Sequence, residues 1–206
     1  MGSEKTVSAA EVKALRERTG AGIMDCKAAL AEAQGDVERA IEILRVRGQA
    51  SAAKRSGRAT TEGIVTSYIH ATGKVGVLVE VQCETDFVAR SDEFKEFANE
   101  VAIHIAGAPS PPIFLSADDI PEEVREAERR VLEAKARGEG KPDDLVERIV
   151  HGQLSKWAKD VALLDQEHVR SDRYESKTIE ELRAELASRT GENVRIARFA
   201  RFVVGE

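Results

Sequence analysis

The sequence predicts an α+β protein: an N-terminal bundle of three short helices, then a three-stranded antiparallel sheet with packed helices and a helical hairpin. Two observations carry this prediction. Apolar residues recur at helical spacing between residues 8 and 48, and the period changes to two between residues 63 and 83. Residues 194–204 can add a third strand to the early pair, so the larger part of the chain is a sheet with helices against one face.

The three N-terminal helices have local start and stop signals. Ser8 and Glu11 have the spacing of a capping box, and the residues Thr-Gly-Ala-Gly at 19–22 end the first helix. The second helix is expected to end at residue 33. Asp36 can cap the third helix, which we expect to end at Gly48.

The predicted domain boundary follows this bundle. Residues 1–55 are expected to form the first domain and residues 56–206 the second. The segment 51–58 is small and basic, and it is either a helical or a flexible linker.

The second domain begins with a predicted β-hairpin. Residues 63–70 and 75–83 alternate, and Thr72-Gly73 supplies the turn between them. With residues 194–204 the sheet has three strands. Its two open edges make pairing with a second copy or another protein plausible.

Helical spacing returns between the strands. Ser91 can cap a helix that includes Phe94 and Ile105, and residues 121–137 and 142–159 predict a helical hairpin. Thr178 and Glu181 form a further capping box, which opens a helix that stops before Gly191.

Composition limits the function classes. Apolar residues make up 42% of the chain and charged residues 33%, as in soluble globular proteins. The net charge of −6 argues against a strong general attraction to nucleic acid. No run of about 18 apolar residues exists and residues 1–7 lack an apolar signal-peptide core, so a cytoplasmic location is expected.

Nothing in the sequence groups reactive side chains. Cys26 and Cys83 stand far apart without His or Cys partners, and the four histidines are scattered. The sequence contains no phosphate loop, nucleophile elbow or dinucleotide fingerprint. We therefore expect no metal, no cofactor, no catalytic residues and no enzyme activity.

The segment Thr85-Asp86-Phe87-Val88 places a scarce aromatic residue between a predicted strand and a predicted helix. A rigid ring on a structured turn suits an anchor for a partner, because little entropy is lost when it docks. Phe87 can equally fold back and seal the core. The residues alone leave these two interpretations open.

Three blocks of the sequence resemble one family. They are Leu-Arg-Glu-Arg-Thr-Gly-Ala-Gly-Ile-Met-Asp-Cys-Lys at 15–27, Glu-Val-Gln-Cys-Glu-Thr-Asp-Phe-Val-Ala-Arg at 80–90, and Gly-Glu-Asn-Val at 191–194 leading to Arg-Phe-Ala-Arg-Phe at 198–202. In this order they are similar to the elongation factor Ts family, in its short bacterial form, over nearly the whole chain.

The resemblance implies a nucleotide-exchange factor that binds elongation factor Tu with GDP and promotes GDP release. It implies that the N-terminal bundle is ubiquitin-associated-like and contacts the GTPase domain of elongation factor Tu. It further implies that Thr85, Asp86, Phe87 and Val88 disturb the partner's magnesium site. The N-terminal contact positions of the family correspond to Lys13, Arg16, Ile23, Met24 and Lys27.

The sequence departs from the family at two places. Many members have Met-Met where this chain has Ile23-Met24, a change that preserves apolar volume, and they usually have Asn in place of Gln82. The short form also implies a homodimer through the sheet domain. The alternatives are a protein-binding module that does not drive exchange and an RNA-binding protein, the latter disfavoured by the acidic balance.

Overall fold

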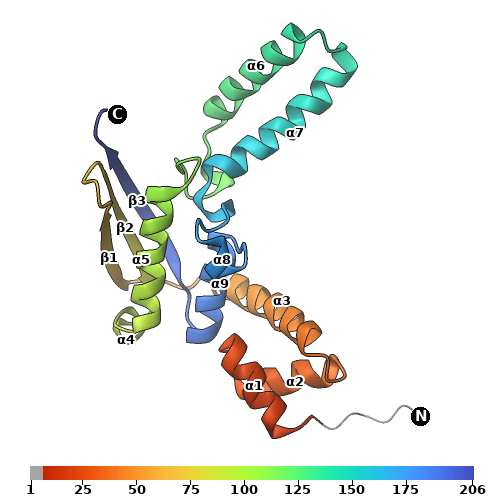
Figure 1. Cartoon of the computed structure of the whole chain (residues 1–206), viewed down its shortest axis with the longest axis vertical. Helices are drawn as coiled ribbons and strands as arrows, with labels where there is room; N and C mark the ends of the chain where they lie inside the picture. Colours follow the sequence, from red (N-terminus) through yellow and green to blue (C-terminus); the bar gives the residue numbers. More distant parts are fainter. Residues whose placement is uncertain (1–6) are drawn as a thin grey trace. The chain divides into compact units, whose positions relative to one another are not determined.

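The computed structural model describes residues 7–206, and for Asp144 the backbone alone. Residues 1–6, which contain most of the segment without a signal-peptide core, lie outside this range. The larger elements, in chain order, are α1 (Ala9–Thr19), α2 (Ile23–Glu32), α3 (Val37–Arg55), β1 (Glu62–Ile69), β2 (Val75–Cys83), α4 (Asp86–Ala89), α5 (Asp92–Gly107), α6 (Glu122–Gly138), α7 (Asp143–Val161), α8 (Ser171–Tyr174), α9 (Ile179–Thr190) and β3 (Arg195–Val203) (Figure 1).

These elements confirm the α+β prediction. The chain divides into two compact units that do not follow the sequence order. The first unit contains Met1–Val65, Glu80–Ala98 and Glu181–Ala197. The second contains Thr66–Val79, Asn99–Glu180 and Arg198–Glu206. The sequence-based division into residues 1–55 and 56–206 stays a prediction.

Helix α1 begins as its sequence predicts. The Ser8 N–H donates to Glu11 Oε2 at 2.8 Å, and the Glu11 N–H donates to Ser8 Oγ at 3.2 Å, which completes the capping box. Asp36 accepts from the Arg39 N–H at 3.1 Å and caps α3 in the same way. Helices α1 to α3 share one core, formed by Val12, Leu15, Cys26, Ala29, Leu30, Ala33 and Ala40.

The predicted end of the third helix at Gly48 is wrong, because α3 continues to Arg55. A glycine inside a helix costs only about 1 kcal/mol, and packing can offset that cost. A Cβ on Gly48 would lie 3.3 Å from Ser188 Oγ, so the missing side chain lets α3 approach α9 closely. Ala52, one turn later, is buried. The linker's first half is therefore helical.

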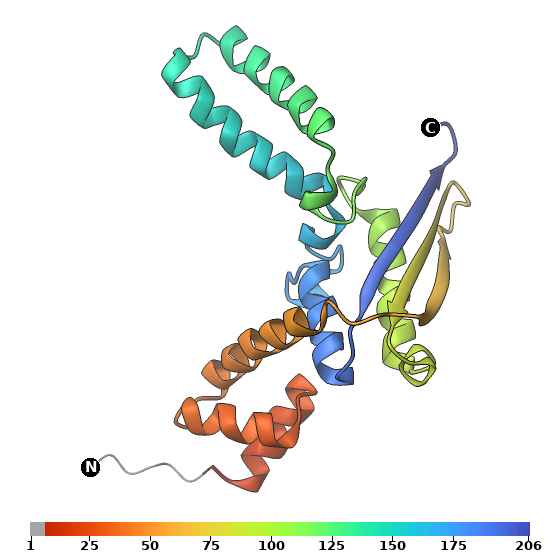
Figure 2. The ribbon, with the colours of Figure 1, turned by 180° about the vertical axis from the view of Figure 1, so that it is seen from behind.

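The three strands form one antiparallel sheet in the order β1-β2-β3, as predicted. Val77, Val79, Val81 and Cys83 of β2 are buried, which confirms the predicted alternation. In both ribbon views α5 lies along one face of the sheet (Figures 1 and 2). Gly63 has φ +152°, and a Cβ there would come within 2.2 Å of the Val81 carbonyl oxygen, so only glycine fits.

Helices α6 and α7 form the predicted hairpin. Ala136, Val146 and Val150 are buried between them, and Leu132 packs against this group. At the base of the hairpin Ala158 and Val161 join Ile120 in a second small core. Within residues 7–206 no helix is long and apolar enough to cross a membrane.

The second unit contains a buried polar cluster that the sequence did not indicate. Glu100, His104 and His168 are all less than 10% exposed. The rings of His104 and His168 lie 5.5 Å apart, and the Tyr174 ring meets His168 edge-on at 4.4 Å. Two of the four histidines, which are 64 residues apart in the sequence, thus come together inside the fold.

Candidate functional site

The short segment between β2 and α5, expected to be a structured turn, contains the one-turn helix α4. Thr85 is its N-cap: Thr85 Oγ1 accepts from the Val88 N–H at 3.4 Å. The Ala89 N–H donates to the Thr85 carbonyl and the Arg90 N–H to that of Asp86. Threonine is a favoured cap residue and Asp86 lies in the first turn, where a negative charge is favourable. This signal was available in the sequence.

The turn separates two neighbouring apolar side chains. Val88 is 6% exposed and faces the core, whereas Phe87 is 83% exposed. Phe87 therefore does not seal the core. Leaving a phenylalanine in water forgoes about 2 kcal/mol of burial free energy, so a fully presented ring suggests a surface made for another molecule.

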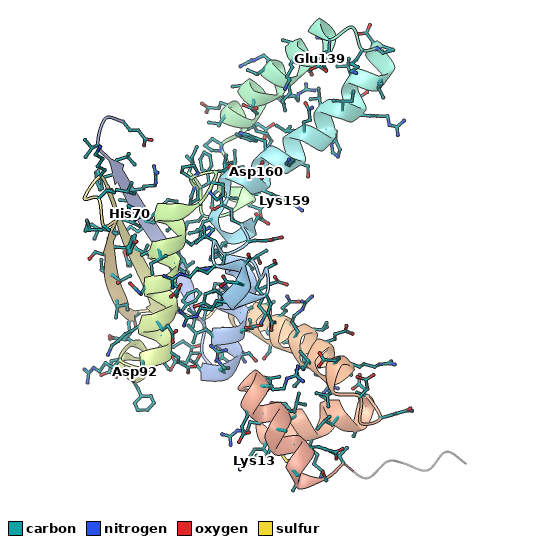
Figure 3. All side chains as sticks on the ribbon, viewed as in Figure 1. Lys13, His70, Asp92, Glu139, Lys159 and Asp160 are labelled. Carbon is teal, nitrogen blue, oxygen red and sulfur yellow. The ribbon has the colours of Figure 1, made fainter. Side chains whose placement is uncertain are left out.

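The surroundings of Phe87 are polar and shallow. Asp86 forms an ion pair with Arg90 at 2.9 Å on the solvent side, worth less than about 1 kcal/mol at such exposure. Asp86, Phe87, Arg90 and Ser91 line an open depression of about 350 Å³. Asp92, labelled in Figure 3, begins the next helix directly after it.

The predicted N-terminal contact residues gather on α1 and α2. Four of the five line one groove of about 370 Å³, whose full lining is Val7, Ala9, Val12, Lys13, Arg16, Ile23 and Lys27. The groove is lined by apolar residues and by three cationic side chains, of which Lys13 is labelled in Figure 3. Met24, the fifth, does not line the groove but is 73% exposed. Four of the predicted contact residues therefore share one groove, and their contact with a partner stays a prediction.

The turn between α1 and α2 fixes how this surface is presented. Gly20 ends α1 in the left-handed region at φ +68°, and its N–H donates to the Arg16 carbonyl at 2.7 Å. Thr19 Oγ1 then accepts from the Ala21 N–H at 3.3 Å. These bonds set the start of α2, and with it the direction of Ile23 and Met24.

The two cysteines are structural. Both are buried, and Cys83 donates its thiol proton to the Thr85 carbonyl at 3.2 Å. Burial, and next the nearby Glu192 carboxylate, raise the pKa of the Cys83 thiol to about 11. A thiol held protonated is a poor nucleophile, so Cys83 serves as a small core residue that also fixes the turn.

The chain matches the family described as Elongation factor TS over residues 6–206. It is 52% identical over 200 residues to Elongation factor Ts of Caldanaerobacter subterraneus subsp. tengcongensis, which covers 97% of this chain and 98% of that protein. It is 53% identical over 195 residues to Elongation factor Ts of Carboxydothermus hydrogenoformans, covering 95% and 88% of the two chains. The corresponding protein of Geobacter sulfurreducens is 48% identical over 201 residues, covering 98% and 91%.

The chain belongs to the elongation factor Ts family. This confirms the resemblance seen in the sequence and supports a role as a translation elongation factor. The match spans both compact units, so the α4 turn and the N-terminal groove are parts of one family member and not of a fused foreign domain.

Sequence reasoning missed the residues that hold these surfaces in place. Glu192 bonds to Glu84 and Thr85, and Asn193 bonds to Glu84, directly before α4 and more than 100 residues away in the sequence. The only available signal was their place in the third block that resembles the elongation factor Ts family. Long-range hydrogen bonds of this kind leave no local pattern in a sequence.

Proposed function

We propose that this elongation factor Ts family member is a guanine-nucleotide exchange factor for elongation factor Tu and performs no covalent chemistry. The single observation that carries the proposal is Phe87, an 83% exposed ring on a capped turn, in a chain that matches this family from end to end. In the proposed mechanism Asp86 and Phe87 enter the partner and disturb its magnesium and nucleotide site. Thr85 and the buried Val88 keep the turn in shape.

The energetics of exchange are reciprocal. A factor that weakens GDP binding to its partner must itself be bound more weakly by the GDP form, by the same ratio. A thousandfold change in GDP affinity corresponds to about 4 kcal/mol. Burying one phenylalanine supplies about 1.5–3 kcal/mol, which is less than that requirement.

A second contact can supply the remainder, and the N-terminal groove is the candidate. We propose that Lys13, Arg16, Ile23, Met24 and Lys27 grip the GTPase domain of elongation factor Tu through a ubiquitin-associated-like bundle. The apolar and cationic residues that line the groove suit a partner surface that combines apolar and acidic residues. Binding at two places lets the factor strain the partner and not merely associate with it.

The proposal is tested by replacing Phe87→Ala and measuring release of labelled GDP from elongation factor Tu. We expect the stimulated rate to fall about 30-fold or more, the loss of a binding hot spot of about 2 kcal/mol. The free energy of unfolding should change by less than about 0.5 kcal/mol, since the ring is exposed. Val131→Ala is the matched control, because Val131 is 61% exposed on α6. If Phe87→Ala leaves the stimulated rate of GDP release unchanged, the proposed role of Phe87 is refuted.

A protein-binding module without exchange activity is the competing function. It would bind elongation factor Tu and leave the rate of GDP release at its basal value. Adding increasing amounts of this protein to elongation factor Tu that carries labelled GDP separates the two functions. An exchange factor raises the rate of GDP release, whereas a binding module leaves that rate unchanged.

We also propose a cytoplasmic homodimer that forms through the sheet. Ile69, Leu78, Phe202 and Val204 are each at least 47% exposed on the strands and the end of β3 in the second unit. Exposed apolar strand residues are a frequent mark of association. Light scattering over a range of concentrations should give the mass of a dimer, and a constant monomer mass would exclude it.

A further inference from the structure

The turn that follows α9 holds the backbone from which Phe87 projects. Glu192 Oε2 accepts from the Glu84 N–H at 3.0 Å and from the Thr85 N–H at 3.1 Å. Glu192 Oε1 accepts from the Thr85 hydroxyl at 2.6 Å. Three hydrogen bonds to one carboxylate are charge-assisted and therefore stronger than neutral ones.

These bonds also determine how Thr85 caps α4. The Thr85 hydroxyl has one proton and two lone pairs, and its proton goes to Glu192. A lone pair is then left for the Val88 N–H, which is the capping bond. Without the carboxylate the hydroxyl can rotate, and the cap loses its orientation.

Asn193 extends the same network to the chain that leaves the bundle. Its backbone N–H donates to Glu84 Oε1 at 2.6 Å. Its side-chain amide donates to the carbonyl oxygens of Ser56 and Arg58 at 3.1 and 2.9 Å. Since both acceptors are carbonyls, the amide nitrogen must face them. Asn193 is 4% exposed, so these bonds are shielded from water.

Residues just before this turn contact the N-terminal helices. Arg55 Nη2, at the end of α3, donates to the Ala187 carbonyl at 3.0 Å. Arg189 packs against Gly20, where a Cβ would lie 2.4 Å from Arg189 Cδ, and its Nε also pairs with Glu93 at 3.2 Å. The stretch 187–193 therefore contacts the α1–α2 turn, the end of α3 and the base of α4. All of these residues belong to the first compact unit.

We propose that Glu192 is a positioning residue for Phe87, and that residues 187–193 keep the Phe87 turn in register with the N-terminal bundle. The exchange readout of this inference rests on the proposed function. The inner side of α4 is anchored by the buried side chains of Val88 and Ala89. The position at which the turn begins depends on the backbone at Glu84 and Thr85. A turn fixed before contact loses less entropy when its ring docks, and this preorganisation strengthens binding.

The first test is a double-mutant cycle on stimulated GDP release. Glu192→Ala should slow release about fivefold in the otherwise unchanged protein and less than twofold in a chain that already carries Phe87→Ala, because the two residues act through one contact. Glu192→Gln keeps a carbonyl oxygen for the two backbone N–H groups and should recover more than half of the lost rate. Equal slowing in both backgrounds, or no slowing in the first, would overturn the assignment.

The second test does not depend on the partner. Amide hydrogen exchange at Glu84 and Thr85 should accelerate at least tenfold with Glu192→Ala and stay unchanged with Glu139→Ala, an exposed control between α6 and α7. Should Glu192→Ala impair folding, Glu192→Gln must give intermediate protection. Unchanged protection of these two amides would refute the positioning role of Glu192, whatever happens to GDP release. If the two amides lose protection but GDP release does not respond to Phe87→Ala or Glu192→Ala, the proposed function is refuted. The positioning role of Glu192 is then retained.

Discussion

The α4 turn and the Glu100–His168 cluster lie in different compact units, and they differ in which side chains they expose and which they bury. The turn exposes a large apolar ring on a backbone fixed by polar contacts. The cluster buries a carboxylate and two imidazoles among packed helices. Exposing apolar surface and burying polar groups both cost free energy. In the proposed function the first cost is offset by binding another molecule. In the cluster, hydrogen bonds within the fold offset most of the second cost.

Both histidine rings of the cluster have hydrogen-bond partners within the fold, whereas Glu100 Oε2 is buried without one among the described residues. His104 Nδ1 accepts from the Val169 N–H at 3.2 Å, which leaves the Nε2–H to donate to Gln166 Oε1 at 2.9 Å. His168 repeats this arrangement with the Arg170 N–H and the Glu100 carbonyl. Both rings thus fit as neutral tautomers, and their role is structural. The comparison predicts that changes in the cluster affect stability, whereas changes at the turn affect exchange.

The largest expected effect comes from Glu100→Ala. Glu100 Oε1 accepts from Arg170 at 2.7 Å and Arg173 at 3.0 Å, and its side chain is only 7% exposed. Removing it should lower the free energy of unfolding by about 2–3 kcal/mol, below the cost for a fully buried pair because both arginines are nearly half exposed. Urea unfolding measures this loss. Stimulated GDP release per folded molecule should stay within twofold, and a tenfold drop would break the division between the two regions.

Acid should destabilise the protein through His104. Burial lowers the pKa of His104 from 6.5 to about 4. Between these values the unfolded state binds a proton that the folded state does not, so the stabilising contribution is complete above about pH 6.5 and is lost as the pH falls toward 4. Burial also lowers the pKa of His168.

For His104 alone the expected loss between pH 7 and pH 5 is about 2 kcal/mol. Urea midpoints at the two pH values measure it, with His104→Gln as the variant that should flatten the dependence. An equally steep dependence in His104→Gln would assign the acid sensitivity to other groups.

The smallest expected effect is at Met24, in the first unit. Met24→Ser should weaken binding to elongation factor Tu about fivefold, the loss of roughly 1 kcal/mol of apolar contact, and should leave the urea midpoint unchanged because Met24 is 73% exposed. Titration calorimetry measures the affinity. If the affinity is unchanged, Met24 does not contribute, and the N-terminal contact is restricted to the groove residues.

Local signals determined how much of this fold was predictable. The capping box at Ser8, the sequence pattern of Thr178 and Glu181 and the period-two run of β2 depend on neighbours in sequence, and the predicted elements are found there. Helix α3 continues past Gly48, where it lies close to Ser188, a residue 140 positions further along the chain that leaves no trace near Gly48. The pairing of His104 with His168 was hidden for the same reason.

The candidate site shows the same limit. Thr85, Asp86 and Phe87 stand out in the sequence, but Phe87 and Val88 are adjacent apolar residues and composition does not tell which one faces the core. The structure buries Val88 and exposes Phe87 on a turn bonded to Glu192. That choice depends on contacts between distant segments, which no local pattern encodes.

The uninterrupted course of α3 has a further consequence. Its 19 residues make a rod of about 28 Å that runs from the bundle core to the carbonyls held by Asn193. One residue inserted near Gly48 would turn the two ends by about 100° relative to each other and lengthen the rod by about 1.5 Å. The number of residues between Asp36 and Arg55 thus fixes the relative rotation of the two ends of α3 as well as their separation.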